Sequence, residues 1–88
     1  MDQKEVFVTN KPPLFTGVNF SYWSVRMRCY LMSLGWNVWE ATEKEHNIGN
    51  AKALNSILNG LTDSVFTKVM QCTSAKQAWD KLKIIYEG

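Results

Sequence analysis

One amphipathic stretch, residues 14–34, constrains the fold of this 88-residue chain more than any other. Its large apolar side chains recur at steps of three and four residues, the spacing that lines one side of an α-helix. These side chains are Phe20, Trp23, Met27, Tyr30, Leu31 and Leu34. The pattern predicts a first helix from about Asn19, its N-cap, to Leu34, with Gly35 as its end. We expect the later helices to pack against this stripe.

Four further segments have helical patterns, at about residues 36–41, 50–59, 62–70 and 74–86. Trp36 and Trp39 would lie on one face of the second helix. Thr62 or Asp63 would cap the fourth. The side chains expected to be buried in the last three helices and the turn between the third and fourth are Leu54, Ile57, Leu58, Leu61, Val65, Phe66, Val69, Met70, Ala78, Trp79, Leu82, Ile85 and Tyr86.

The start of the fifth helix has a recognisable signal. Ser74 and Gln77 fit a capping box, S-x-x-Q, in which each side chain accepts from the other residue's backbone N–H. Further along, Asp80 lies three residues before Lys83, which allows a surface ion pair. This segment therefore predicts a capped helix with one charged and one apolar face.

Residues 1–13 are predicted to form an extended arm, because Pro12 and Pro13 exclude a helix there. Residues 6–8 (Val-Phe-Val) pack across the helices, pair as a strand with a partner, or belong to a frayed terminus. The expected fold is all-α: a small bundle of about five helices in a single domain, residues 14–88, after this arm.

Composition excludes several classes of protein. Ten basic and eight acidic residues give a net charge of +2, which makes no case for a dedicated nucleic-acid binder. The two cysteines, Cys29 and Cys72, are expected to be free thiols, which suits a reducing compartment. The polar start is no signal peptide, and no apolar run reaches the ~20 residues of a membrane span. We expect a cytoplasmic, or alternatively nuclear, protein that is not secreted.

No motif of a known catalytic site occurs in the sequence. Cys29 could be paired with His46 as nucleophile and base, but a cysteine beside the apolar stripe is expected to be a small buried residue. His46 lies among charged residues, where a histidine is solvated. We therefore expect no enzyme, no metal site and no cofactor.

RNA contact is an alternative that rests on one edge of the first helix. Tyr22, Arg26 and Tyr30 follow one another at steps of four residues, and Arg28 lies close by. Aromatic and basic side chains together can stack on bases and bind phosphates. The same pattern is also expected of tyrosines that border a core with their hydroxyl groups in water.

Three motifs in order resemble a known family. The first is F-x-G-x-N-F-x-x-W-x-x-x-M-x-x-x-L, from Phe15 to Leu31, followed by Gly35 and Trp39. The last is T-S-A-K-Q-A-W-x-x-L-x-x-x-Y, from Thr73 to Tyr86. Between them lie the helical positions Ala53, Leu54, Ile57, Leu61 and Val69. Together they resemble the N-terminal capsid region of the Gag polyprotein of Ty1/copia-type LTR retrotransposons, which is abundant in plant genomes.

The chain departs from the family pattern in two ways. Ser74 interrupts the usual Thr-Ala-Lys, and the sequence ends where the family usually continues with further capsid helices and often a C-x2-C-x4-H-x4-C zinc knuckle. RNA packaging by a knuckle is therefore not implied. An apolar face that later helices would cover is expected to be bare.

The resemblance implies a structural protein that self-associates. We expect a homo-oligomer, such as a dimer, or association with full-length Gag, in capsid assembly or in interference with it. The alternative is a domesticated Gag-like adaptor that binds a peptide or host protein in an apolar groove between the first and fifth helices. The residues expected at an interface are Trp36, Trp39, Trp79 and Tyr86. For Trp36 and Trp39, packing against the first helix is the competing interpretation.

Overall fold

The computed structural model describes residues 11–45 and 47–87 and contains five α-helices in those ranges. They are α2 (Phe20–Leu34), α3 (Trp36–Glu43), α4 (Asn50–Asn59), α5 (Asp63–Val69) and α6 (Ala75–Tyr86). The prediction of an all-α fold of five helices is therefore confirmed. The expectations for residues 1–10, including residues 6–8, and for His46 lie outside the described residues.

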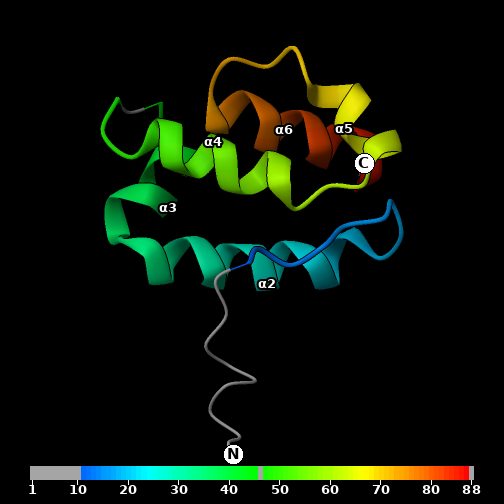
Figure 1. The fold of residues 1–88 in the computed structure, drawn as a ribbon, viewed down its shortest axis with the longest axis horizontal. Helices are drawn as coiled ribbons and strands as arrows, with labels where there is room; N and C mark the ends of the chain where they lie inside the picture. Colours follow the sequence, from blue (N-terminus) through cyan, green and yellow to red (C-terminus); the bar gives the residue numbers. More distant parts are fainter. Residues whose placement is uncertain (1–10, 46, 88) are drawn as a thin grey trace, which may run out of the picture.

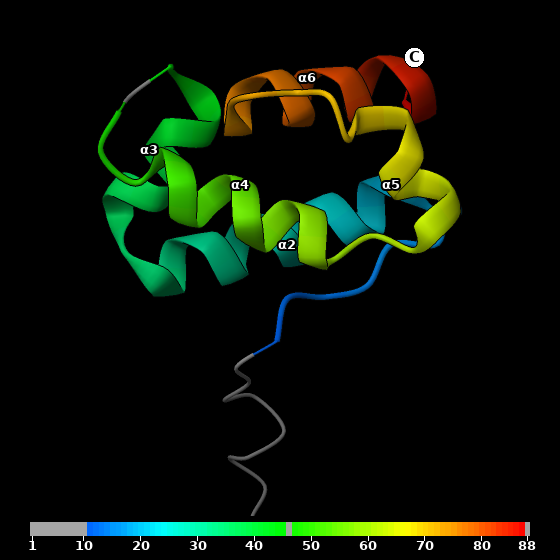
Figure 2. The same cartoon turned by 45° about the horizontal axis from the view of Figure 1, so that its top comes forward.

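Helix α2 forms one side of the molecule, and the remaining helices are stacked on it (Figure 1). Short α3 turns the chain back, so that α4 and α6 run side by side above α2 (Figures 1 and 2). Helix α5 connects these two helices at the end of the molecule that is remote from α3 (Figure 2). The segment before α2 runs back along the same helix (Figure 1), and the carbonyl oxygen of Pro13 accepts a hydrogen bond from Trp23 Nε1 at 2.9 Å.

The buried side of α2 is the predicted one. Phe20, Trp23, Met27 and Leu31 are buried, and Tyr30 and Leu34 pack partly buried against them. The predicted cap is wrong in its mechanism, although α2 does begin directly after Asn19. Asn19 has φ 58° and ψ 58°, and its side chain makes no capping hydrogen bond. A capping side chain needs an extended backbone, whereas asparagine tolerates this left-handed one.

The capping box of α6 is confirmed in one half. Ser74 Oγ accepts a hydrogen bond from the backbone N–H of Gln77 at 3.1 Å. Gln77 Oε1 instead accepts from the N–H of Thr73, one residue earlier than expected, at 3.0 Å. The N–H of Ala75 donates to Asn50 Oδ1 at 2.8 Å, which ties the start of α6 to the start of α4.

Phe15 joins the segment before α2 to the rest of the fold. Its N–H donates to the carbonyl oxygen of Gly60 at 2.7 Å, and its own carbonyl accepts from the N–H of Thr62 at 3.1 Å. A β-carbon on Gly60 would lie 2.6 Å from the Pro13 carbonyl oxygen, so this close approach requires glycine. The short segment is thus held like a strand beside the α4–α5 connection, and the Phe15 ring is directed into the core.

Three burial predictions are wrong. Cys29 is exposed, because it lies two residues from both Met27 and Leu31 and so falls on the opposite side of α2. Met70 is exposed because α5 ends at Val69 and the chain turns there. Ile85 is exposed at the edge of α6, whose buried side is made by Ala75, Ala78, Trp79 and Leu82.

Candidate binding groove

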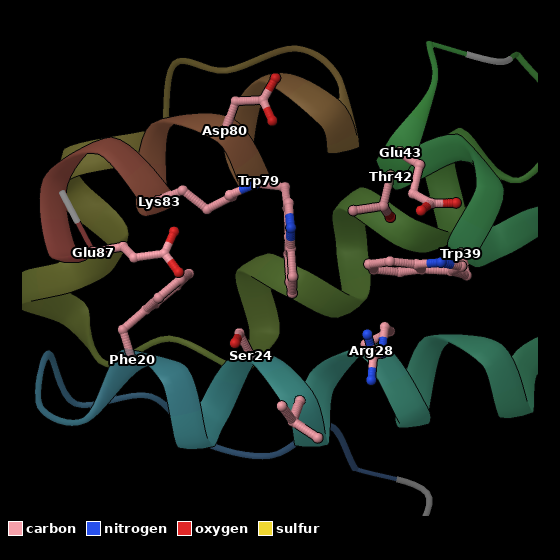
Figure 3. Close-up of a pocket in the computed structure, with 11 residues that line it drawn as sticks. Phe20, Ser24, Arg28, Trp39, Thr42, Glu43, Trp79, Asp80, Lys83 and Glu87 are labelled. Atoms are coloured by element: carbon pink, nitrogen blue, oxygen red, sulfur yellow. The ribbon is translucent and has the colours of Figure 1, made fainter.

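A groove of about 420 Å³ lies between α2 and α6 and is closed at one end by α3 (Figure 3). Its position agrees with the groove that the sequence suggested between the first and fifth helices. The residues that line it are Phe20, Ser24, Val25, Arg28, Trp39, Thr42, Glu43, Trp79, Asp80, Lys83 and Glu87.

Aromatic rings form the floor of the groove. Trp79 of α6 meets Trp39 of α3 edge to face, with ring centroids 5.5 Å apart, and its centroid lies 6.4 Å from that of Phe20 on α2. All three side chains are largely buried and reach the groove through narrow exposed edges. The floor is therefore a rigid apolar surface, because each ring is fixed by core packing on its other faces.

Charged side chains of both signs form the rim (Figure 3). Arg28 on α2 and Lys83 on α6 supply positive charge, whereas Glu43, Asp80 and Glu87 supply negative charge. The groove is thus apolar only at its floor. A ligand that fits it needs an apolar group for the floor and polar or charged groups at its edges.

Asp80 is already engaged. Its Oδ2 accepts from Lys76 Nζ at 2.6 Å, so the predicted pair of Asp80 with Lys83 is wrong. The hydrogen bond and the charge of Asp80 raise the pKa of Lys76 above its ordinary value of 10.5. Lys83 is left to line the groove rather than to pair with Asp80.

The hydroxyl groups in the groove offer no arrangement for catalysis. Ser24 Oγ donates to the carbonyl oxygen of Ser21 at 3.0 Å, and Thr42 Oγ1 donates to that of Val38 at 3.3 Å. Both donors are thus used within their own helices. In residues 11–45 and 47–87, no group of three or more His, Cys, Asp or Glu could hold a metal ion.

The four predicted interface residues lie in different environments. Trp36 is 62% exposed at the start of α3, whereas Trp39 is buried three residues later, so these two side chains do not occupy one face. Trp39 and Trp79 meet at the floor of the groove. Tyr86 is half-buried, and its ring lies edge-on to that of Phe15, with centroids 4.9 Å apart.

The residues proposed for RNA contact are divided between two sides of α2. The Arg26 guanidinium lies over the Tyr22 ring, 5.7 Å from its centroid, in a cation–π contact. These two residues line a small hollow beside Pro13 and Leu14. Arg28 instead lines the groove between α2 and α6. The structure therefore places one arginine with the tyrosine and the other apart from it.

Sequence reasoning missed most of the groove. Thr42, Glu43 and Lys83 look like ordinary polar surface residues in the sequence, because nothing local indicates that the helices bring them together. Phe15 lies before the first predicted helix, and no periodic pattern includes it, although it is a centre of the aromatic core. The only signal for it was a large aromatic residue within a turn-like sequence.

The five helices and the groove between them define a small all-α module. Consistent with this class, the sequence profile of the gag-polypeptide of LTR copia-type matches residues 10–88, and the chain therefore belongs to this family. The resemblance noted in the sequence is confirmed, and the chain is a Gag-related structural module of copia-type retrotransposons. No curated protein and no solved structure matches the chain.

None of the helices in the described part of the chain combines the length and the apolarity that a membrane crossing requires.

Proposed function

We infer that this chain acts by homo-association, either as part of a Gag shell or by interfering with shells built from longer Gag chains. Its membership of the copia-type Gag family supports this function. The single observation that carries it is the 62% exposure of Trp36 on a chain whose other tryptophans are buried. Tryptophan is enriched in the energetically dominant contacts of protein interfaces, and its exposure in water is unfavourable.

Light scattering of the chain over a hundred-fold range of concentration tests this function. The expected result is a mass that rises from the 10.1 kDa of one chain to that of a dimer or larger species. Trp36→Ser should shift this rise to higher concentration, whereas Ile48→Ser, at another exposed apolar residue, should not. A single-chain mass at every concentration, with no effect on the assembly of full-length Gag, would overturn the function.

A second candidate function is that of an adaptor that binds a peptide in the groove between α2 and α6. The rigid aromatic floor and the charged rim favour it, because a peptide offers both apolar side chains and polar ends. Peptides selected on the unmodified chain from a random library should lose binding to Ser24→Tyr, whose ring would fill the groove. Ala51→Tyr, on the exposed side of α4, is the matched control. Selected peptides that bind all three chains equally would exclude the groove.

A further inference from the structure

The rim of the groove between α2 and α6 carries four charged side chains that form no ion pair within the described part of the chain. Arg28 and Lys83 lie on opposite walls, and Glu43 and Glu87 lie towards opposite ends (Figure 3). The fifth charged residue of the rim, Asp80, already has its lysine partner. An occupant that carries charges of both signs beside an apolar group therefore matches both the rim and the aromatic floor.

The N-terminal arm of the chain has this chemistry. In residues 2–8, Asp-Gln-Lys-Glu-Val-Phe-Val, charges of both signs directly precede a short apolar run centred on Phe7. A phenyl ring suits the floor, because aromatic rings attract one another edge to face at centroid distances of about 4.5–7 Å. Lys4 is opposite in charge to the two glutamates of the rim, and Glu5 is opposite in charge to its arginine and lysine.

The arm is too short to reach the groove of its own copy. It passes Tyr22 and Arg26, whereas the groove is lined by the α2 residues two positions further on, which point to the opposite side of the helix. Figure 3 shows the segment before α2 on the far side of this helix from the groove. Phe7 is four residues before Lys11, a span of at most about 14 Å in an extended chain. The path half-way around a helix about 10–12 Å across is longer, roughly 16–19 Å.

We propose that the arm of one copy, residues 2–8, occupies the groove between α2 and α6 of another copy, with Phe7 on the aromatic floor. This contact rests on the proposed homo-association and identifies the two surfaces that meet. The arm and the groove lie on different sides of α2, so one copy can give its arm and receive another at the same time. Such a head-to-tail contact is not limited to two copies, because each added copy brings a further groove.

The test of the arm is a substitution in the full chain. Phe7→Ser should raise the concentration at which association occurs by about ten-fold or more, because the central aromatic contact is lost. Val18→Ser, at an exposed residue outside the groove, should leave this concentration unchanged. Light scattering measures the mass, and circular dichroism measures the helix content. Unweakened association of Phe7→Ser overturns the proposal, and so does a loss of its helix content, which would place the ring in the core of its own copy.

The test of the groove is a complementation experiment. Ser24→Tyr, whose ring fills the groove, should weaken association as Phe7→Ser does, whereas Ala51→Tyr should not. Ser24→Tyr keeps its arm and Phe7→Ser keeps its groove, so a mixture of the two should form a complex at a concentration where neither associates alone. A chain with both substitutions has neither surface and should join neither variant. A mixture without this complex would show that the arm and the groove do not meet.

The remaining outcomes separate this inference from the proposed function. Association that is weakened by Trp36→Ser but not by Phe7→Ser or Ser24→Tyr leaves homo-association intact and overturns the contact between arm and groove. A single-copy mass at every concentration overturns both. If peptides selected from a random library bind the groove of such a monomer, and a synthetic peptide of residues 1–10 does not displace them, the groove takes a foreign peptide and not the arm.

Discussion

Phe15 has an influence on the fold that exceeds its place in a short loop. Its ring stacks on Trp23 with centroids 4.9 Å apart and meets Tyr86 edge-on at 4.9 Å. It also lies 5.5 Å from the ring of Phe20. One side chain therefore joins the segment before α2, α2 itself and the end of α6.

Replacement of this ring should be costly. We expect Phe15→Ala to lower the free energy of unfolding by about 3–5 kcal/mol, because it removes a fully buried aromatic side chain and leaves a cavity. Urea unfolding followed by circular dichroism measures this change. Val18→Ala, at an exposed position of the same segment, should change it by less than about 0.5 kcal/mol. Similar losses in the two variants would contradict the central position of Phe15.

Single residues were the least predictable part of the site from the sequence. The burial of Trp23 or Met27 follows from the period of α2, but the period alone says nothing about Phe15, which lies outside any helix. Its environment depends on Gly60 and Tyr86, both more than forty residues away in sequence. The exposure of Cys29, in contrast, could have been predicted. Its helical position, two residues from both Met27 and Leu31, places it on the side of α2 opposite the buried one.

At the scale of the element, α6 carries the clearest electrostatic prediction. The pKa of Lys76 is raised by its hydrogen bond to Asp80 and by the charge of Asp80. We expect Asp80→Asn to return this pKa towards 10.5, as measured by NMR titration of the lysine side chain. A Lys76 pKa that is unaffected by the substitution would show that the ion pair does not form in solution.

The raised pKa of Lys76 also determines how this ion pair changes the stability of the fold with pH. A group whose pKa is higher in the folded state stabilises that state while it is protonated. The contribution of Lys76 is therefore complete below pH 10.5 and is lost as the pH rises through the raised pKa. Because both side chains are substantially exposed, the contribution is small and is further reduced by salt.

Helix boundaries were largely predictable, whereas side-chain partners at helix ends were not. Residues 50–59 were predicted as a helix and form α4 within the same bounds, because Gly49 and Gly60 bracket a strong apolar pattern. The cap at Asn19 failed because its backbone is left-handed, a property that the residue type permits but does not indicate. Asp80 has basic residues four positions before it and three after it, and sequence alone does not decide between them.

At the scale of the whole molecule, the four tryptophans differ in their exposure to solvent, so that fluorescence can distinguish them. Trp23, Trp39 and Trp79 are buried in one aromatic cluster, and Trp36 is exposed. At concentrations where the chain is monomeric, Trp36→Phe should remove most of the fluorescence quenched by iodide and shift the remaining emission to shorter wavelength. The matched variant Trp39→Phe should retain the quenched component. Equal quenching in both variants would contradict the exposure of Trp36.

The all-α fold class could be predicted from the sequence. The groove could be predicted only in its position between the first and fifth helices, not in the residues that line it. Five amphipathic segments in an 88-residue chain leave few alternatives to a bundle of helices. The groove lies where the packing of α2, α3 and α6 is incomplete, and its charged rim comes from residues that look like ordinary surface residues in each helix. A gap between three elements depends on their angles, which no local pattern encodes.

The contact between Phe15 and Tyr86 also has a consequence during translation. These rings meet 4.9 Å apart although they are separated by almost the whole chain. While a ribosome is still synthesising α6, the aromatic surface of Phe15 and Trp23 is without its final covering. The domain therefore completes its core only after residue 86 has left the exit tunnel, and nascent chains on one messenger present this surface to one another until then.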